Sequence, residues 1–147
     1  MSAVSYSAIR QRFSTAVKTI AGFTESRNPL DPQIRQPDTL SNLRFAVGIG
    51  GSVAREDSRQ LSPVGAYVET SVEVRFTYRL RPKDQVTDYD GSMDQAELVI
   101  KKIMDRGAPL YTNIHIRYDR MVHNVTDSGE YIITSLEFGV LHHLPLN

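Results

Sequence analysis

The sequence predicts an α+β protein, a two-layer sandwich in which two helices pack on one face of a four-stranded antiparallel or mixed sheet. Alternating apolar and polar residues mark four strands, and apolar residues at helical spacing mark two helices. The elements follow in the order helix, strand, strand, helix, strand, strand. Because each strand has one apolar and one polar face, the sheet is expected to be covered on one side only.

Length and composition predict one domain, residues 1–147, with its own core. The chain has no cysteine, which fits a reducing compartment. No apolar run reaches transmembrane length and no secretory signal is visible, so a soluble protein made in the cytoplasm is expected. Seventeen basic and seventeen acidic residues give a net charge of zero. This balance argues against a dedicated nucleic-acid binder and permits self-association.

The first helix is expected from Ser7 onward, with Ser5 or Ser7 as its cap and Gly22 as the residue that ends it. Its buried side is formed by Ile9, Phe13, Ala16, Val17 and Ile20. An amphipathic stripe of this kind typically covers a sheet.

An extended, proline-bearing connection is expected over residues 24–42, where no apolar period is present. Structureless loops of this length are uncommon inside compact domains and are often functional. Two interpretations remain open: a strap across the protein's own surface, or a loop ordered by a partner.

The first strand is expected over residues 43–49, followed by an exposed loop over residues 50–65. Gly48, Gly50 and Gly51 do not form a phosphate-binding loop, because the G-x-x-x-x-G-K-[ST] pattern and its lysine are absent.

The stretch over residues 66–80 is expected to be one long strand, since apolar and polar residues alternate through it without interruption. At about 3.3 Å per residue it would span roughly 50 Å, so part of it is expected to project beyond the body of the domain.

The second helix is expected to begin at Met93, after a turn marked by Asp90 and Gly91. Ser92 and Gln95 have the spacing of a capping box, and Gly107 follows the helix.

The last two strands are expected to form an antiparallel hairpin. The first begins near Thr112 and the second spans residues 131–140, with the turn-rich sequence HNVTDSGE between them.

No catalytic, cofactor-binding or metal site is predicted. Adjacent His142 and His143 point to opposite faces of a strand and are expected at the surface, like the other histidines. Four aspartates cluster near the second helix without matching a calcium-binding loop: Asp84, Asp88, Asp90 and Asp94. With no G-x-S-x-G elbow either, an enzyme is not expected.

The polar face of the sheet is expected to carry charges of both signs and several tyrosines. Its charged residues are Glu69, Glu73, Arg75, Arg79, His115, Arg117, Asp119 and Glu137, and the same parity holds Tyr67, Tyr111, Tyr131 and Ile133. A solvated face is the default interpretation. Tyrosine and arginine amid mixed charge are also enriched at protein–protein interfaces.

The chain resembles the tail terminator, or tail completion, proteins of long-tailed bacteriophages. The likeness covers about Ile9 to Leu144 and rests on the order of the elements and on the stretches VETSVEVRFTYRLRP, DYDGSMDQAELVIKKIM and YTNIHIRYDR…EYIITSLEFGVLHHLPL.

This resemblance implies a protein that is monomeric when free and caps the tail tube as a hexameric ring. The ring stops tube polymerisation and offers a surface to the head connector, without catalysis or cofactor. Its partners would be its own copies, the tail tube protein and head–tail connector proteins, at the neck of the virion. It implies no membrane and no specific nucleic acid, although DNA would pass through the ring.

Exposed charge at strand ends and on the polar face indicates where the subunit or tube contacts would lie. The candidates are Arg55, Glu56, Asp57, Arg59, Glu69, Glu73, Arg75, Arg79, Arg81, Lys83, Asp84, Asp88 and Tyr89. A head–tail connector or neck protein is the nearest alternative, an RNA-binding α+β domain is a more distant one, and a small enzyme is the last.

Overall fold

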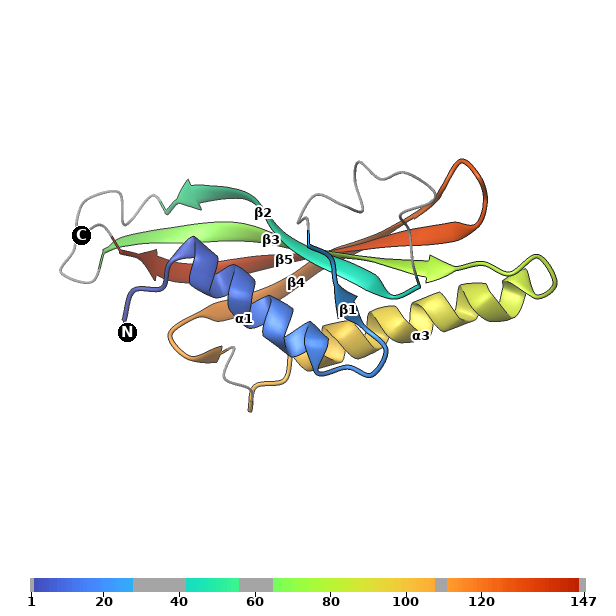
Figure 1. Cartoon of the computed structure of the whole chain (residues 1–147). Helices are drawn as coiled ribbons and strands as arrows, with labels where there is room; N and C mark the ends of the chain where they lie inside the picture. Colours follow the sequence, from blue (N-terminus) through green and yellow to red (C-terminus); the bar gives the residue numbers. More distant parts are fainter. Residues whose placement is uncertain (1, 28–41, 56–64, 108–110, 146–147) are drawn as a thin grey trace.

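The computed structural model describes residues 2–27, 42–55, 65–107 and 111–145 (Figure 1). The elements are α1 Tyr6–Lys18, β1 Thr24–Glu25, β2 Arg44–Ala54, β3 Ala66–Arg79, α3 Gln85–Ile103, β4 His115–Val125 and β5 Tyr131–Leu144. They form an α+β sandwich of two layers, and this part of the prediction is confirmed.

The sheet has five strands in the order β1-β2-β3-β5-β4, where the sequence predicted four. The added strand is β1, which pairs parallel with β2, whereas all the other pairs are antiparallel. Two residues are too few to show a period, so the first part of the predicted connection over 24–42 was not recognised as a strand. The remainder of that connection, residues 28–41, lies outside the described residues.

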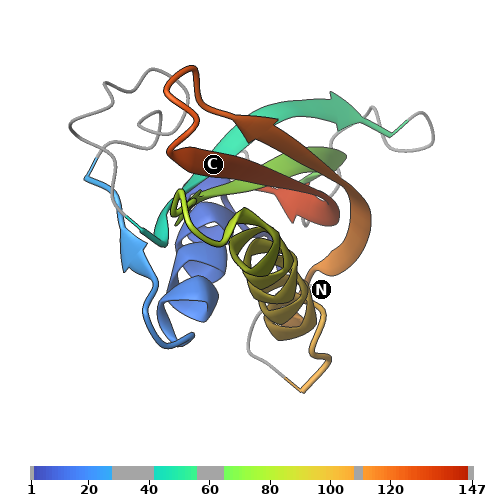
Figure 2. The same cartoon turned by 90° about the vertical axis from the view of Figure 1, so that its right-hand side faces the viewer.

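Both helices lie on the same face of the sheet, as predicted (Figure 2). Four phenylalanines with no exposed surface occupy the layer between helices and sheet: Phe13, Phe45, Phe76 and Phe138. The rings of Phe13 on α1 and Phe138 on β5 meet edge to face with their centroids 5.6 Å apart. Burial of this apolar layer is the main stabilising term for the fold.

Helix α1 begins where the sequence predicted. The Ser5 hydroxyl accepts a hydrogen bond from the Ala8 amide at 3.2 Å and caps the first turn. Gly22 has a φ of 90°, the left-handed conformation expected of it, although the helix itself ends at Lys18.

Helix α3 begins eight residues earlier than predicted, at Gln85 instead of Met93. Asp90 and Gly91 are helical, and Ser92 is fully buried with its hydroxyl donating to the Tyr89 carbonyl at 2.7 Å, so the predicted turn and capping box are wrong. A Cβ at position 91 would collide with the Tyr78 hydroxyl on β3. Glycine is present here for close packing of helix on sheet, and not to turn the chain.

Strand β3 is the long central strand that the sequence predicted. It pairs with β5 along its whole length, from Ala66 opposite Leu144 to Arg79 opposite Tyr131. The strand therefore does not project alone. One end of the molecule is instead extended by the end of β3, the β4–β5 hairpin and the start of α3 together (Figure 1).

The loop predicted over residues 50–65 starts later than expected, because β2 continues to Ala54. A bulge between Ile49 and Gly51 shifts the register and lets β2 remain paired with β3 as far as Val68. Residues 56–64 lie outside the described part of the chain.

The closing hairpin is antiparallel, as predicted, with different bounds. Strand β4 begins at His115 instead of Thr112 and continues to Val125, while β5 continues to Leu144. A second bulge lies between Tyr118 and Arg120, which the alternation of residue types did not indicate.

Candidate protein–protein interface

The face of the sheet away from the helices is a layer of ion pairs. Arg117 on β4 contacts Glu69 on β3, two strands away, and its Nε donates to Asp119 at 2.5 Å. The hydrogen bonds that Arg117 donates to Asp119 and Glu69 raise the pKa of its guanidinium, which stays charged. This arrangement is possible because Gly139 on β5 has no side chain, and the guanidinium lies where a Cβ would be.

Two carboxylates, Glu73 and Glu137, lie directly opposite each other at the centre of this face. Like charges in this position repel each other. Each carboxylate has an arginine partner, Arg75 for Glu73 and Arg120 for Glu137. The mixed charge that the sequence predicted is therefore organised into pairs, and the face can meet a polar partner without a large net field.

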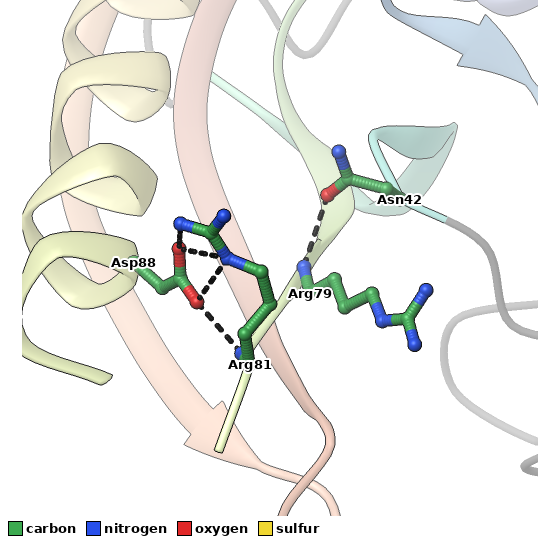
Figure 3. Close-up of polar contacts among 4 residues, drawn as sticks. All are labelled: Asn42, Arg79, Arg81 and Asp88. Atoms are coloured by element: carbon green, nitrogen blue, oxygen red, sulfur yellow. Dashed lines mark hydrogen bonds and ion pairs between the residues drawn. The ribbon is translucent and has the colours of Figure 1, made fainter. Parts of the chain in front are cut away.

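Arg79 and Arg81, at and just after the end of β3, make hydrogen bonds that hold the local structure (Figure 3). The Arg79 amide donates to the Asn42 side chain at 2.9 Å. The Asp88 carboxylate accepts from the Arg81 amide at 2.6 Å and from the Arg81 guanidinium at 2.8 Å. These hydrogen bonds lower the pKa of Asp88, whose surface is only 4% exposed. Asp88 thus fastens the start of α3 to the end of β3 and is a poor candidate for contact with a partner.

The other candidate residues are divided between the two ends of the molecule. Arg55 follows β2, where its amide donates to the Tyr67 carbonyl at 3.1 Å. Lys83 and Asp84 are exposed beside the start of α3. Glu56, Asp57 and Arg59 lie outside the described residues.

An apolar surface at the extended end was missed by sequence reasoning. Val86 is 75% exposed, Val125 is 59% exposed and Tyr89, already a candidate, is 46% exposed. The Tyr89 ring faces His123 on β4, with centroids 5.9 Å apart. Val86 and Tyr89 share one side of α3, which was hidden because this stretch had been interpreted as a loop. We call Val86, Tyr89, His123 and Val125 the end patch.

Tyr111 does not lie on the open face, where parity had placed it. Its ring packs against the core and its hydroxyl lies 3.7 Å from the Met104 sulfur. The strand begins only at His115, so alternation does not apply at position 111.

His142 is fully buried, and the prediction of a surface histidine is wrong. Its Nδ1 lies 2.9 Å from the Val4 carbonyl oxygen and its Nε2 lies 2.7 Å from the Thr70 hydroxyl. Burial lowers the pKa of His142, and its Nδ1 donates to the Val4 carbonyl oxygen, which can only accept. The signal was present in the sequence, since position 142 continues the buried parity of Leu136, Phe138 and Val140.

One cavity of about 330 Å³ lies between α1 and the β1–β2 edge, lined by Arg10, Glu25, Ser26, Arg27, Ala46 and Val47. Glu25 is engaged there by Lys18 at 2.8 Å and by the Ser14 hydroxyl at 2.5 Å. Burial raises the pKa of Glu25, but these partners outweigh it and the pKa lies below its usual value. A carboxylate held in this way is a structural anion and a poor proton acceptor.

Over the four described ranges, no group of three histidine, aspartate or glutamate side chains could hold a metal ion. Of the two helices bounded above, neither is long and apolar enough to cross a membrane. No family model matches the chain, and no curated protein is significantly similar to it.

Proposed function

We propose that this protein is a tail terminator of a long-tailed bacteriophage. It forms a hexameric ring on the last ring of the tail tube, stops tube polymerisation and provides the surface to which the head connector attaches. Its place is the neck of the virion, after synthesis in the host cytoplasm. Its partners are its own copies, the tail tube protein and the connector proteins, and DNA passes through the ring.

The observation that supports this proposal is the separation of two different exposed surfaces on one rigid sandwich. The open sheet face is polar and built of ion pairs, whereas the end patch is apolar and lies at the extended end. A subunit of a closed ring uses different surfaces for its two neighbours, and a capping subunit needs another for the tube. Exposed apolar side chains beside an aromatic residue are typical of such contacts.

The decisive experiment is light scattering on the purified protein, alone and mixed with isolated tail tubes, with the tube ends imaged in the same samples. The expected result is a monomer of 16.5 kDa that becomes a ring at one end of each tube. Failure to bind tube ends, combined with binding to the portal side, would establish the connector function instead. Salt-sensitive binding to single-stranded RNA without either would indicate the RNA-binding alternative.

Two alanine variants with matched exposure test the end patch. Tyr89 is 46% exposed and Leu98, on the same helix but outside the patch, is 45% exposed. Tyr89→Ala is expected to weaken tube capping, because aromatic anchors carry much of the binding energy at interfaces. Leu98→Ala is expected to cap normally, and equal capping by both variants would remove the end patch from the proposal.

The segment that follows β2 has its own test. Reversing Arg55 and Arg59 to glutamate is expected to impair ring formation or tail joining, because Arg55 is exposed where β2 ends and the change reverses the sign of two charges in this segment. Normal assembly by this variant would exclude these two arginines as contacts.

A further inference from the structure

The two outer strands of the sheet differ in how much of their edge is covered. On one side, β1 pairs only with Arg44 and Phe45 of β2. Among the described residues, no strand pairs with residues 46–54 on the side away from β3. On the other side, β4 is the last strand of the described sheet along its whole length (Figure 1).

Among the described residues, the edge of β2 over residues 46–54 has only one of the usual protections against pairing, a bulge. Natural edge strands are guarded by charges, prolines or bulges. The sequence AVGIGGSVA over residues 46–54 has a bulge but neither charge nor proline. Beyond the bulge the strand remains regular, residues 50–54 are exposed, and Val53 is 70% exposed. Such an edge is suited to receive another strand.

The direction of the strands allows the two edges of successive copies to meet. Three antiparallel pairings separate β2 from β4, so these two strands run in opposite directions. A second copy placed beside the first in the same orientation brings its β2 next to β4 as an antiparallel neighbour. The alternation of the sheet then continues from copy to copy.

The register shows which residues would meet if the copies are not shifted along the strands. Gly48 is level with Glu73, Glu137 and Arg120 across the sheet. Arg120 would therefore lie beside Gly48 of the next copy, with that copy's Glu73 one strand beyond. A Cβ at Gly48 would meet nothing, so the space above this residue is open to an arginine side chain.

The same geometry already exists inside the molecule. Arg117 on β4 crosses Gly139 on β5 to reach Glu69 on β3. Between copies, Arg120 would cross Gly48 to reach Glu73 in the same way. Glu73 faces another carboxylate, so it favours a further guanidinium. Arg120 of β4 thus complements Glu73, the carboxylate that lies behind Gly48 of β2.

We infer that the edge of β2, residues 46–53, pairs with the edge of β4, residues 115–122, of a second copy of this chain. This contact is the subunit interface of the ring, and it rests on the proposed function for its closure into a hexamer. The zero net charge leaves no long-range repulsion between copies. The antiparallel strands β2, β3, β5 and β4 of successive copies then join into one continuous sheet.

Two lysine variants at exposed apolar positions test the edge. Val53→Lys places a charge on the β2 edge and beside His115 of the neighbouring copy, whereas Leu98→Lys places the same charge on α3. Ring occupancy at tube ends is expected to fall about tenfold for Val53→Lys, through a charge that disfavours edge pairing, and to stay unchanged for Leu98→Lys. Equal assembly by both variants, with unchanged melting temperatures, would overturn the inference.

The absence of native cysteine permits a direct test of register. Val53 is level with Glu69, Leu141 and His115. A mixture of Val53→Cys and His115→Cys proteins is expected to form a mixed disulfide on oxidation of assembled rings. The mixture of Val53→Cys with Asn124→Cys, at the far end of β4, is the matched control and should not. Disulfides between two Val53→Cys copies, or no disulfide in either mixture, would overturn the pairing.

Failure of this inference can be distinguished from failure of the proposed function. If the wild-type protein does not bind tube ends, the proposed function fails. The same cysteine mixtures are then oxidised in concentrated free protein, where the mixed disulfide still supports the pairing and its absence excludes it. Amide exchange in the monomer adds an independent result: fast exchange is expected for those amides of residues 46–53 that point away from β3, and strong protection of these amides would overturn the inference.

Discussion

The two faces of one sheet have opposite chemistry, and strand β5 contributes to both. Its residues that point toward the helices, such as Leu136, Phe138 and Val140, have no exposed surface. The residues between them, Glu137 and Gly139, belong to the layer of ion pairs on the open side. Apolar burial contributes most of the stability, whereas exposed ion pairs contribute little. The open face is therefore free to change for binding without loss of the fold.

The largest loss of stability is expected from a substitution on the face of the sheet that packs against the helices. Phe138→Ala removes a fully buried ring that contacts Phe13 and Tyr118, and it should lower the free energy of unfolding by about 3–5 kcal/mol. Leu141→Ala on the open side of the same strand is the control, with an expected loss of about 1 kcal/mol because that side chain is only partly buried. Urea denaturation of both variants checks the difference. Similar losses would contradict the contrast between the faces.

A second prediction concerns the close contact between α3 and the sheet at Gly91. Gly91→Ala would normally stabilise a helix, but here the new methyl group collides with the Tyr78 hydroxyl. We expect a loss of about 1–3 kcal/mol, as for other overpacked positions. In a Tyr78→Phe background the loss should shrink, because the colliding oxygen is gone. An unchanged loss in that background would show that the Tyr78 hydroxyl is not the obstacle.

These two positions also show what the sequence could predict. The alternation through residues 66–79 and 131–140 is uninterrupted, so two central strands and their buried sides followed from residue type alone. Gly91 could not be interpreted correctly, since an Asp-Gly pair is a turn signal unless a close tertiary neighbour is known. The two-residue strand β1 and both bulges depend on pairing partners that a local pattern does not contain.

The candidate interface residues also divide into those that the sequence placed correctly and those that it did not. The open-face residues Glu69, Glu73 and Arg75 were predicted from parity, and the structure places them on the ion-paired face. Arg81 and Asp88 were expected in an exposed loop, yet they form a contact that fastens β3 to α3. Pairing between elements decides whether a charge is free for a partner, and composition does not reveal it. The end patch was missed because the start of α3 had been interpreted as a loop.

A third prediction concerns His142, a polar side chain on the otherwise apolar side of the sheet. Burial lowers its pKa in the folded state, so the unfolded chain binds the proton more readily. The contribution of His142 to the free energy of unfolding is fully present above the pKa of the unfolded chain, about 6.5. It is lost as the pH falls below that value. The loss is at most about 1.4 kcal/mol per pH unit.

Urea denaturation between pH 5 and pH 8 measures how the free energy of unfolding changes with pH. His142→Gln should flatten the dependence of the free energy of unfolding on pH, because the buried imidazole is gone. His123, whose pKa burial also lowers, adds a loss of the same sign, so His142→Gln is expected to remove only part of the dependence. If the pH dependence is the same in His142→Gln, His142 does not take up a proton when the protein unfolds.

The smallest effect is expected on the open face, at the glycine that makes room for Arg117. Gly139→Ala puts a methyl group where the guanidinium lies, which should break its contact with Glu69. Because Arg117 is more than half exposed, the loss should be under about 1 kcal/mol, and smaller still in high salt. In an Arg117→Ala background the same substitution should be neutral or stabilising, since alanine is favoured over glycine within a strand. A double-mutant cycle measures this change of sign. If Gly139→Ala has the same effect in both backgrounds, the glycine does not serve the ion pair, and the internal precedent for an arginine crossing Gly48 between copies is lost with it.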